Sequence, residues 1–159
     1  MILLALALTV ATTASTATTI SYVPPVDAPI IERFRPPACT WCPGNRGIDY
    51  ATPPGAPVRA SAGGVVTFSG SVAGDLFVVV AHADGLRTTY GYLATAIVAA
   101  GDRVVSRQLL GTAGGPLHFG VRRGDVYLDP ELLFIVERLV ARLVPLGGDR
   151  PFTGAVQPV

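Results

Sequence analysis

The side chains of this sequence that are best suited to hydrolytic chemistry are two histidines and one carboxylate. Asp49 and His118 both lie in short glycine-containing runs, at residues 44–50 and 115–120. Neutral imidazole and carboxylate are common zinc ligands, and bound zinc can activate water. The only other histidine is His82, so a three-histidine site is excluded. We therefore consider Asp49 and His118 as candidate metal ligands. A structural role is the alternative for His118 and is the role expected of His82, at the end of a predicted strand.

Two cysteines form a second candidate group. Cys39 and Cys42 are separated by Thr40 and Trp41. In an exported protein this spacing favours a short-loop disulfide, which is our expectation, whereas in a reducing compartment it would indicate redox chemistry or metal binding. A further alternative is that both cysteines turn toward Asp49 and complete a zinc site with His118. A thioredoxin-like role is disfavoured because no βαβ pattern surrounds the pair.

The composition excludes several classes of function. The 159 residues carry a net charge of +1, and half of them are hydrophobic, with a mean hydropathy of +0.48. This much apolar surface argues against a disordered chain, and the absence of a basic excess argues against nucleic acid as a partner. All twelve basic residues are arginine. Schiff-base chemistry, a P-loop and a biotinyl or lipoyl attachment site all need lysine and are therefore excluded.

The elements that must position these residues are short strands separated by glycine turns. The spacing predicts an all-β domain, a sandwich or barrel. A hairpin turn is predicted at residues 83–85, and Thr88, Tyr90 and Tyr92 are expected to share one face of the following strand. The predicted strands cover 65–68, 76–82, 86–93, 103–105, 109–111, 117–121 and 126–128. Asp129 and Pro130 are suited to begin a helix as N-cap and first helical residue.

Five segments follow from this pattern. Residues 1–22 begin with an apolar run, which predicts a cleaved signal peptide or, alternatively, a membrane anchor. Residues 23–43 are expected to form a proline-rich linker that contains the two cysteines. The β domain then covers 44–130, one C-terminal helix covers 131–145, and 146–159 form a flexible tail. The apolar side of that helix would pack on the sheet, on a membrane or on a partner.

An ordered set of motifs resembles the lysostaphin/LytM-type peptidoglycan metallopeptidase family. No single motif is decisive, but their order is specific, and the similarity covers roughly residues 44–134. The resemblance implies an all-β fold with a groove on its sheet, of the duplicated hybrid motif type. The matching segments are 47–49, 54–66, 79–90, 100–104, 110–111, 117–122 and 129–130.

The resemblance also assigns roles, residue by residue. Asp49 and His118 match two zinc ligands of the family, but Asn45 stands where the first histidine ligand is expected. Tyr92 and Pro116 replace the two catalytic histidines. An amide oxygen does not replace imidazole for zinc, a tyrosine is a poor general base at neutral pH, and proline has no polar side chain. We therefore expect weak or absent zinc binding and no peptidase activity.

The apolar N-terminal run and the two cysteines together predict a secreted or membrane-anchored protein, and the resemblance implies that it works at the cell wall. The expected function is that of a catalytically degenerate binding module, whose partner is peptidoglycan or a cell-wall hydrolase or division protein. Asn45, Tyr90 and Tyr92 are the residues expected to line its groove. The alternative is an active zinc metalloendopeptidase that cleaves peptidoglycan cross-links with Asp49, His118 and unusual third groups.

Overall fold

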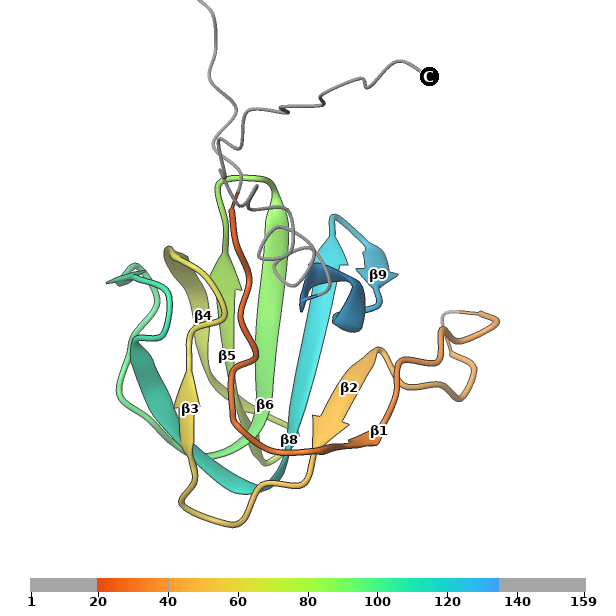
Figure 1. Ribbon diagram of the computed structural model, residues 1–159, viewed down its shortest axis with the longest axis horizontal. Helices are drawn as coiled ribbons and strands as arrows, with labels where there is room; N and C mark the ends of the chain where they lie inside the picture. The colour runs from red at the N-terminus through yellow and green to blue at the C-terminus, as the bar shows by residue number, and fades with distance from the viewer. Residues whose placement is uncertain (1–19, 40, 135–159) are drawn as a thin grey trace, which may run out of the picture.

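A single antiparallel sheet forms the framework of the protein (Figure 1). The computed structural model describes residues 20–39 and 41–134. Within these residues the strand order is β1-β2-β8-β6-β5-β4-β7, while β3 and β9 both pair with β8. The strands are β1 (Ile30–Glu32), β2 (Gly47–Tyr50), β3 (Pro57–Arg59), β4 (Gly64–Val72), β5 (Asp75–Ala81), β6 (Leu86–Ala96), β7 (Arg103–Val104), β8 (Leu109–Arg123) and β9 (Val126–Leu128).

The long strand β8 organises this sheet. It hydrogen-bonds to β2, β3, β6 and β9, so it holds together segments that lie far apart in the sequence. The sequence predicts two short strands here, at 109–111 and 117–121, and the structure joins them into one. The all-β prediction is confirmed, but the strands form one continuous sheet and not the two stacked sheets of a sandwich.

Tight turns set the register of the two central hairpins. Ala73 and Gly74 both have positive φ angles, 54° and 99°, as a two-residue hairpin turn of the primed type requires. In the β5–β6 turn, Gly85 has a φ of 84°, and the Asp84 carboxylate accepts a hydrogen bond from the Leu86 amide at 3.1 Å. The hairpin predicted at residues 83–85 is therefore confirmed.

A chain of buried polar groups crosses the hydrophobic core. The His82 ring nitrogens lie 2.8 Å from the Gly63 carbonyl oxygen and 2.8 Å from Thr88 Oγ1. Thr88 Oγ1 lies 3.1 Å from the Tyr90 hydroxyl, which also accepts the Ser61 amide at 2.7 Å. Burial lowers the pKa of His82, with smaller opposing effects from Gly63 and the Asp84 carboxylate. His82 has the structural role that the sequence predicts.

The segment predicted as a linker instead packs against the sheet. Tyr22 and Val23 are buried, and the Tyr22 hydroxyl donates to both carboxylate oxygens of Asp84 at 3.0 and 2.9 Å. The Val23 amide donates to the Ser61 carbonyl at 2.9 Å, and the Ser61 hydroxyl donates to the Val23 carbonyl at 2.6 Å. We name residues 20–29 the N-terminal strap, which follows one face of the sheet (Figure 1). Residues 23–29, the first part of the predicted stiff linker, therefore pack on the sheet through Val23, Val26 and Ala28.

The chain turns into a helix after β9. The Glu131 amide donates to Asp129 Oδ1 at 3.0 Å, as the predicted N-cap requires, and residues 131–134 are helical. The remainder of the predicted helix, the predicted tail at 146–159, and residues 1–19 of the predicted signal peptide or anchor lie outside the described residues. Within the described part, no helix has the length and apolarity to cross a membrane.

Candidate functional site

Asp49 and His118 meet on neighbouring strands. They are directly opposed in the β2–β8 register, and Asp49 Oδ1 lies 2.7 Å from His118 Nδ1. Both side chains are about one-fifth exposed, so solvent reaches them from one side. The sequence places these residues 69 positions apart, and the antiparallel pairing brings them together. The structure thus places the two candidate ligands side by side, and their role as metal ligands stays a prediction.

Asn45 completes this cluster as a hydrogen-bond donor. Its Nδ2 donates to Asp49 Oδ2 at 3.1 Å, while its Oδ1 accepts the Gly47 amide at 3.2 Å. A backbone N–H can only face an acceptor, so the Gly47 contact fixes which way the Asn45 amide points. The amide therefore presents hydrogen atoms to Asp49 and holds its oxygen toward the backbone. Asn45 is buried, and it is not available to line a groove as the sequence analysis expects.

The residues present do not fit the zinc site that the family resemblance implies. A catalytic zinc centre uses three protein ligands and keeps one position open. Here Asp49 and His118 supply two donors, and the third position holds an N–H group. Over residues 20–39 and 41–134, no cluster of three His, Cys, Asp or Glu side chains could hold one metal ion. The cluster is an internally hydrogen-bonded network of aspartate, histidine and asparagine.

Tyr92 sits at an irregularity between β6 and β8. The register runs from Gly91↔His118 to Leu93↔Ala113, so residues 114–117 of β8 lie opposite Tyr92 alone. Tyr92 has a φ of 61°, a conformation that is rare for a bulky residue and that costs energy. The irregularity turns its ring outward, 47% exposed, with its centroid 6.2 Å from the His118 ring.

Tyr90 and Tyr92 consequently do not share a face, contrary to expectation. Tyr90 is fully buried, and its hydroxyl bonds within the core. Burial raises the pKa of Tyr90 to about 12, so the phenol stays protonated at neutral pH. The predicted groove role of Tyr90 is wrong, because alternation along β6 places its side chain on the core face. Alternation ends only after Gly91, where the irregularity turns Tyr92 outward.

An open groove lies beside the Asp49–His118 pair. Tyr92 and Pro116 both line it, together with the tip of the β4–β5 hairpin. Asp75 is the one charged side chain among the residues that line the groove. The Phe77 ring packs against the Tyr92 ring, with centroids 5.7 Å apart. Sequence reasoning missed the hairpin tip, since only the β5–β6 register shows that it reaches Tyr92. The groove is lined by Ser71, Gly74, Asp75, Leu76, Tyr92, Leu93, Ala94, Gly114, Gly115 and Pro116.

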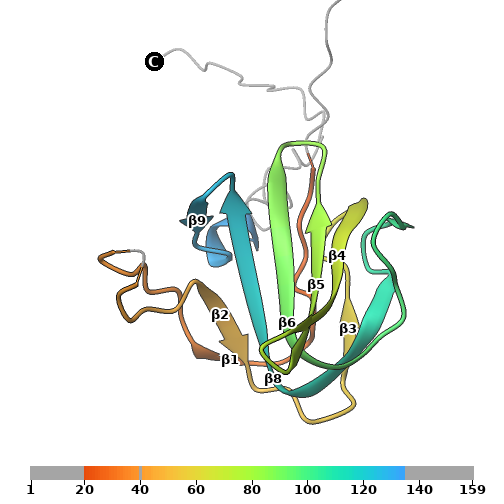
Figure 2. The same ribbon diagram turned by 180° about the vertical axis from the view of Figure 1, so that it is seen from behind.

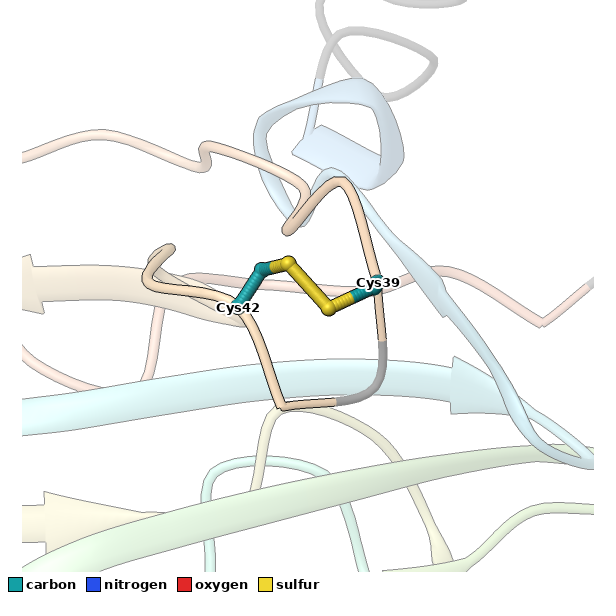
Figure 3. The surroundings of a disulfide bond; sticks show 2 residues. All are labelled: Cys39 and Cys42. Atoms are coloured by element: carbon teal, nitrogen blue, oxygen red, sulfur yellow. A yellow bond between two sulfur atoms is a disulfide. The ribbon is translucent and has the colours of Figure 1, made fainter.

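The cysteines are linked to each other and not to the Asp49–His118 cluster. Cys39 and Cys42 form a disulfide with a Cα–Cα distance of 5.0 Å (Figure 3). The short-loop disulfide is therefore confirmed, and the alternative zinc site built from both cysteines, Asp49 and His118 is wrong. A disulfide sulfur is not the thiolate that binds zinc.

The comparisons with known proteins agree with this fold. The model of Peptidase family M23 matches residues 43–130, more than half of the chain. The chain therefore belongs to Peptidase family M23, the family that includes the lysostaphin/LytM-type domains. The predicted family and fold are confirmed.

Two curated relatives extend this result. The chain is 35% identical over 133 residues to the uncharacterized protein Rv2891 of Mycobacterium tuberculosis, which is 76% of this chain and 52% of that protein. It is 39% identical over 113 residues to the DD-carboxypeptidase/endopeptidase Mpg of Neisseria gonorrhoeae, 66% of this chain and 26% of that one. The chain thus spans about half of the mycobacterial relative and about a quarter of the neisserial one.

A solved structure also shares the fold. The structure of the SpoIIQ–SpoIIIAH pore-forming complex matches with a TM-score of 0.62 and 25% identity, over 72% of this chain and 90% of the matched chain. A domain of this fold therefore occurs in a complex between proteins as well as in enzymes.

Proposed function

We propose that this chain is a catalytically inactive M23 domain, which acts outside the cytoplasm as a binding module for peptidoglycan peptides or for a cell-wall hydrolase. The observation that carries the proposal is the position of the Asn45 amide. It donates to Asp49 at the place where a third zinc ligand would have to stand, and its own oxygen is held by the Gly47 amide. Asp49 is thereby hydrogen-bonded through both carboxylate oxygens, to His118 and to Asn45.

The groove also lacks the groups that move protons in peptide hydrolysis. Tyr92 can donate a hydrogen bond to a carbonyl oxygen, and Pro116 can neither donate nor accept through its side chain. General acid–base groups are each worth about 10²–10⁴-fold in rate, and an oxyanion donor about 10²–10³-fold. The loss of both imidazoles and one metal ligand would therefore reduce turnover below detection.

The same groove remains suited to binding. It is open and lined by small residues, with one aromatic ring and one carboxylate, Asp75, at its rim. A peptide can approach the backbone closely at Gly114 and Gly115, and an amino group on that peptide would find Asp75. The SpoIIQ–SpoIIIAH complex supports a protein as the alternative occupant for a domain of this fold.

Activity remains a specific alternative, because the Asp49–His118 pair is retained and Mpg is named as a carboxypeptidase and endopeptidase. Under this alternative the chain would hydrolyse peptidoglycan peptides with a zinc ion held by two protein ligands and a further group. The two functions predict opposite results in one assay.

The deciding experiment measures hydrolysis of purified cell-wall peptides by the wild-type protein in excess zinc, beside Asp49→Ala. We expect no turnover from either protein, and retained binding of the peptides by the wild type. Turnover in the wild type that disappears in Asp49→Ala would overturn the proposal and establish the enzyme. Tyr92→Ala serves as the binding control and should weaken peptide binding, because it removes the aromatic wall of the groove.

A further inference from the structure

A protruding loop carries the only tryptophan of the sequence. The side chain of Trp41 is 91% exposed. We name the described residues 36–39 and 41–44 the tryptophan loop. Figures 1 and 2 show that it extends from the β1–β2 end of the sheet and away from the core. Tryptophan is rarely left this open, because its large apolar surface favours burial. Its position points to a contact outside this domain.

Two cross-links hold the tryptophan loop in shape. At its base, Arg35 and Asn45 exchange two backbone hydrogen bonds of 3.0 and 2.9 Å. Near its tip, the Cys39–Cys42 disulfide and a 3.1 Å bond from the Cys42 amide to the Cys39 carbonyl close the turn around Trp41 (Figure 3). A contact residue on a pre-formed loop loses less conformational entropy when it binds. The loop thus presents one aromatic ring at low entropic cost.

The surroundings of Trp41 favour a small, flat ligand face. Its described neighbours on the loop are prolines, an alanine, a glycine and the disulfide, and no second aromatic ring lies in this loop. A stable protein–protein interface buries about 1,200–2,000 Å² in total, and a narrow loop offers little of that area. The axial C–H face of a sugar ring matches one indole face in size. The C–H face of the sugar is also weakly positive, whereas the face of the indole ring is negative, so the two faces attract each other.

The charges around the loop favour an acidic ligand. Residues 30–46 contain three arginines and one glutamate, a net charge of +2. Arg33 pairs with Glu131 and Arg35 with Glu32, and both arginine side chains are about 70% exposed. Exposed ion pairs of this kind are weak, so a carboxylate on a ligand can compete for these arginines.

We propose that the tryptophan loop is a carbohydrate-binding arm, in which Trp41 stacks on a sugar ring of an acidic, N-acetylated glycan strand. This inference rests on the proposed wall-binding function and adds a second contact to it, on the glycan and outside the peptide groove. Asn45 joins the two contacts, because its backbone closes the loop and its side chain holds Asp49. A wall polymer could then be held at its sugar and at its peptide.

The test uses Trp41 as its own reporter. The full-length protein is titrated with soluble β-1,4-linked N-acetylglucosamine oligomers and with peptide-free glycan strands that carry muramic acid, and emission is excited where tyrosine does not absorb. We expect a saturable change in emission with both ligands. Tighter binding is expected for the acidic strands, and their advantage should decrease as salt is added. An emission spectrum unchanged at millimolar sugar would overturn the proposal.

Variants separate the loop from the groove. Co-sedimentation with peptide-free glycan strands should fall about tenfold or more in Trp41→Ala, the loss expected for a dominant contact residue. It should be largely kept in Trp41→Phe. The matched control is Ile97→Ala, a change at another exposed apolar residue, 64% exposed on a different loop. Tyr92→Ala should bind the strands normally, so a failure of the peptide groove leaves this result intact. Equal binding by Trp41→Ala and the wild type would contradict the proposal.

Discussion

Asn45 shows how a single side chain can close a site. Histidine can offer a lone pair to a metal, whereas this asparagine directs its N–H toward Asp49 and its oxygen toward the Gly47 amide. Asp49 accepts a hydrogen bond from Asn45 on one oxygen and contacts His118 with the other, so this partly buried carboxylate has protein partners at both oxygens. The substitution therefore exchanges a coordination bond for a hydrogen bond and leaves the strand pairing unchanged.

Asn45→His should restore zinc binding and leave hydrolysis absent. The new imidazole would join Asp49 and His118 as a third ligand, and the gain in zinc affinity should exceed the roughly 10–100-fold that supporting residues alone contribute. Zinc retained after dialysis, quantified by a chromogenic chelator, checks this result. Asn45→Ala is the control and should gain nothing. Zinc retained equally by the wild type would contradict our account of the amide.

His82 should make the stability of the protein depend on pH. Burial lowers the pKa of His82 in the folded state below its value in the unfolded chain. The unfolded state therefore binds more protons in the window between the two pKa values. The contribution of His82 is fully present above the unfolded pKa of about 6.5 and is lost as the pH falls toward the folded pKa.

Urea unfolding between pH 7.5 and pH 5 measures this effect. The free energy of unfolding of the wild type should decrease as the pH falls. His82→Gln should be less stable than the wild type at pH 7.5, and its free energy of unfolding should decrease less as the pH falls. His118→Gln is the matched control, because it changes the only other histidine of the sequence. This variant should keep the pH dependence of the free energy of unfolding that His82 causes. An identical pH dependence in the wild type and His82→Gln would refute the assignment.

The elements act by overriding the local sequence pattern. The β6–β8 irregularity turns Tyr92 out of the face that alternation assigns to it, beside His118 and not beside Tyr90. The N-terminal strap shows the opposite effect: its proline-rich sequence predicts an extended linker, and the structure packs it against the core. Burial and the neighbouring Asp84 carboxylate raise the pKa of Tyr22, which keeps its hydroxyl a donor.

Tyr22→Phe should destabilise the domain by about 1–3 kcal/mol, because hydrogen bonds to a charged acceptor are worth this much. Tyr22→Ala also removes a buried ring and should cost about 3–5 kcal/mol. Thermal or urea unfolding measures both values. Tyr127→Phe, at a tyrosine 41% exposed on β9, is the control and should change stability by less than about 0.5 kcal/mol. If Tyr22→Ala behaved like this control, the strap would not be part of the folded unit.

At the scale of the whole molecule, the disulfide is the feature that bears on where the protein acts. Cys39 and Cys42 are joined in the structure, and disulfides persist in oxidising compartments. This observation supports the proposal of an extracytoplasmic protein, whether it is released or held at a membrane.

We therefore expect residues 1–30 to export a passenger. Fused to a reporter that is active only outside the cytoplasm, this segment should give activity, because an apolar run followed by small residues is read as a secretion signal. A fusion that begins at residue 20 is the control and should be silent. A silent reporter in the first fusion, expressed from its native start, would contradict the localisation.

The sequence by itself determined the all-β class and the disulfide, because hydrophobic alternation, glycine turns and short spacings are written along the chain. An ordered set of motifs determined the family and the candidate ligands Asp49 and His118, whereas the β2–β8 pairing decided that these two side chains meet. The tertiary structure decided the orientation of the Asn45 amide, the outward turn of Tyr92, the burial of Tyr90 and the packing of the strap. Each of these depends on a partner brought in by strand register or by core packing, and a change in register reverses which face a side chain occupies.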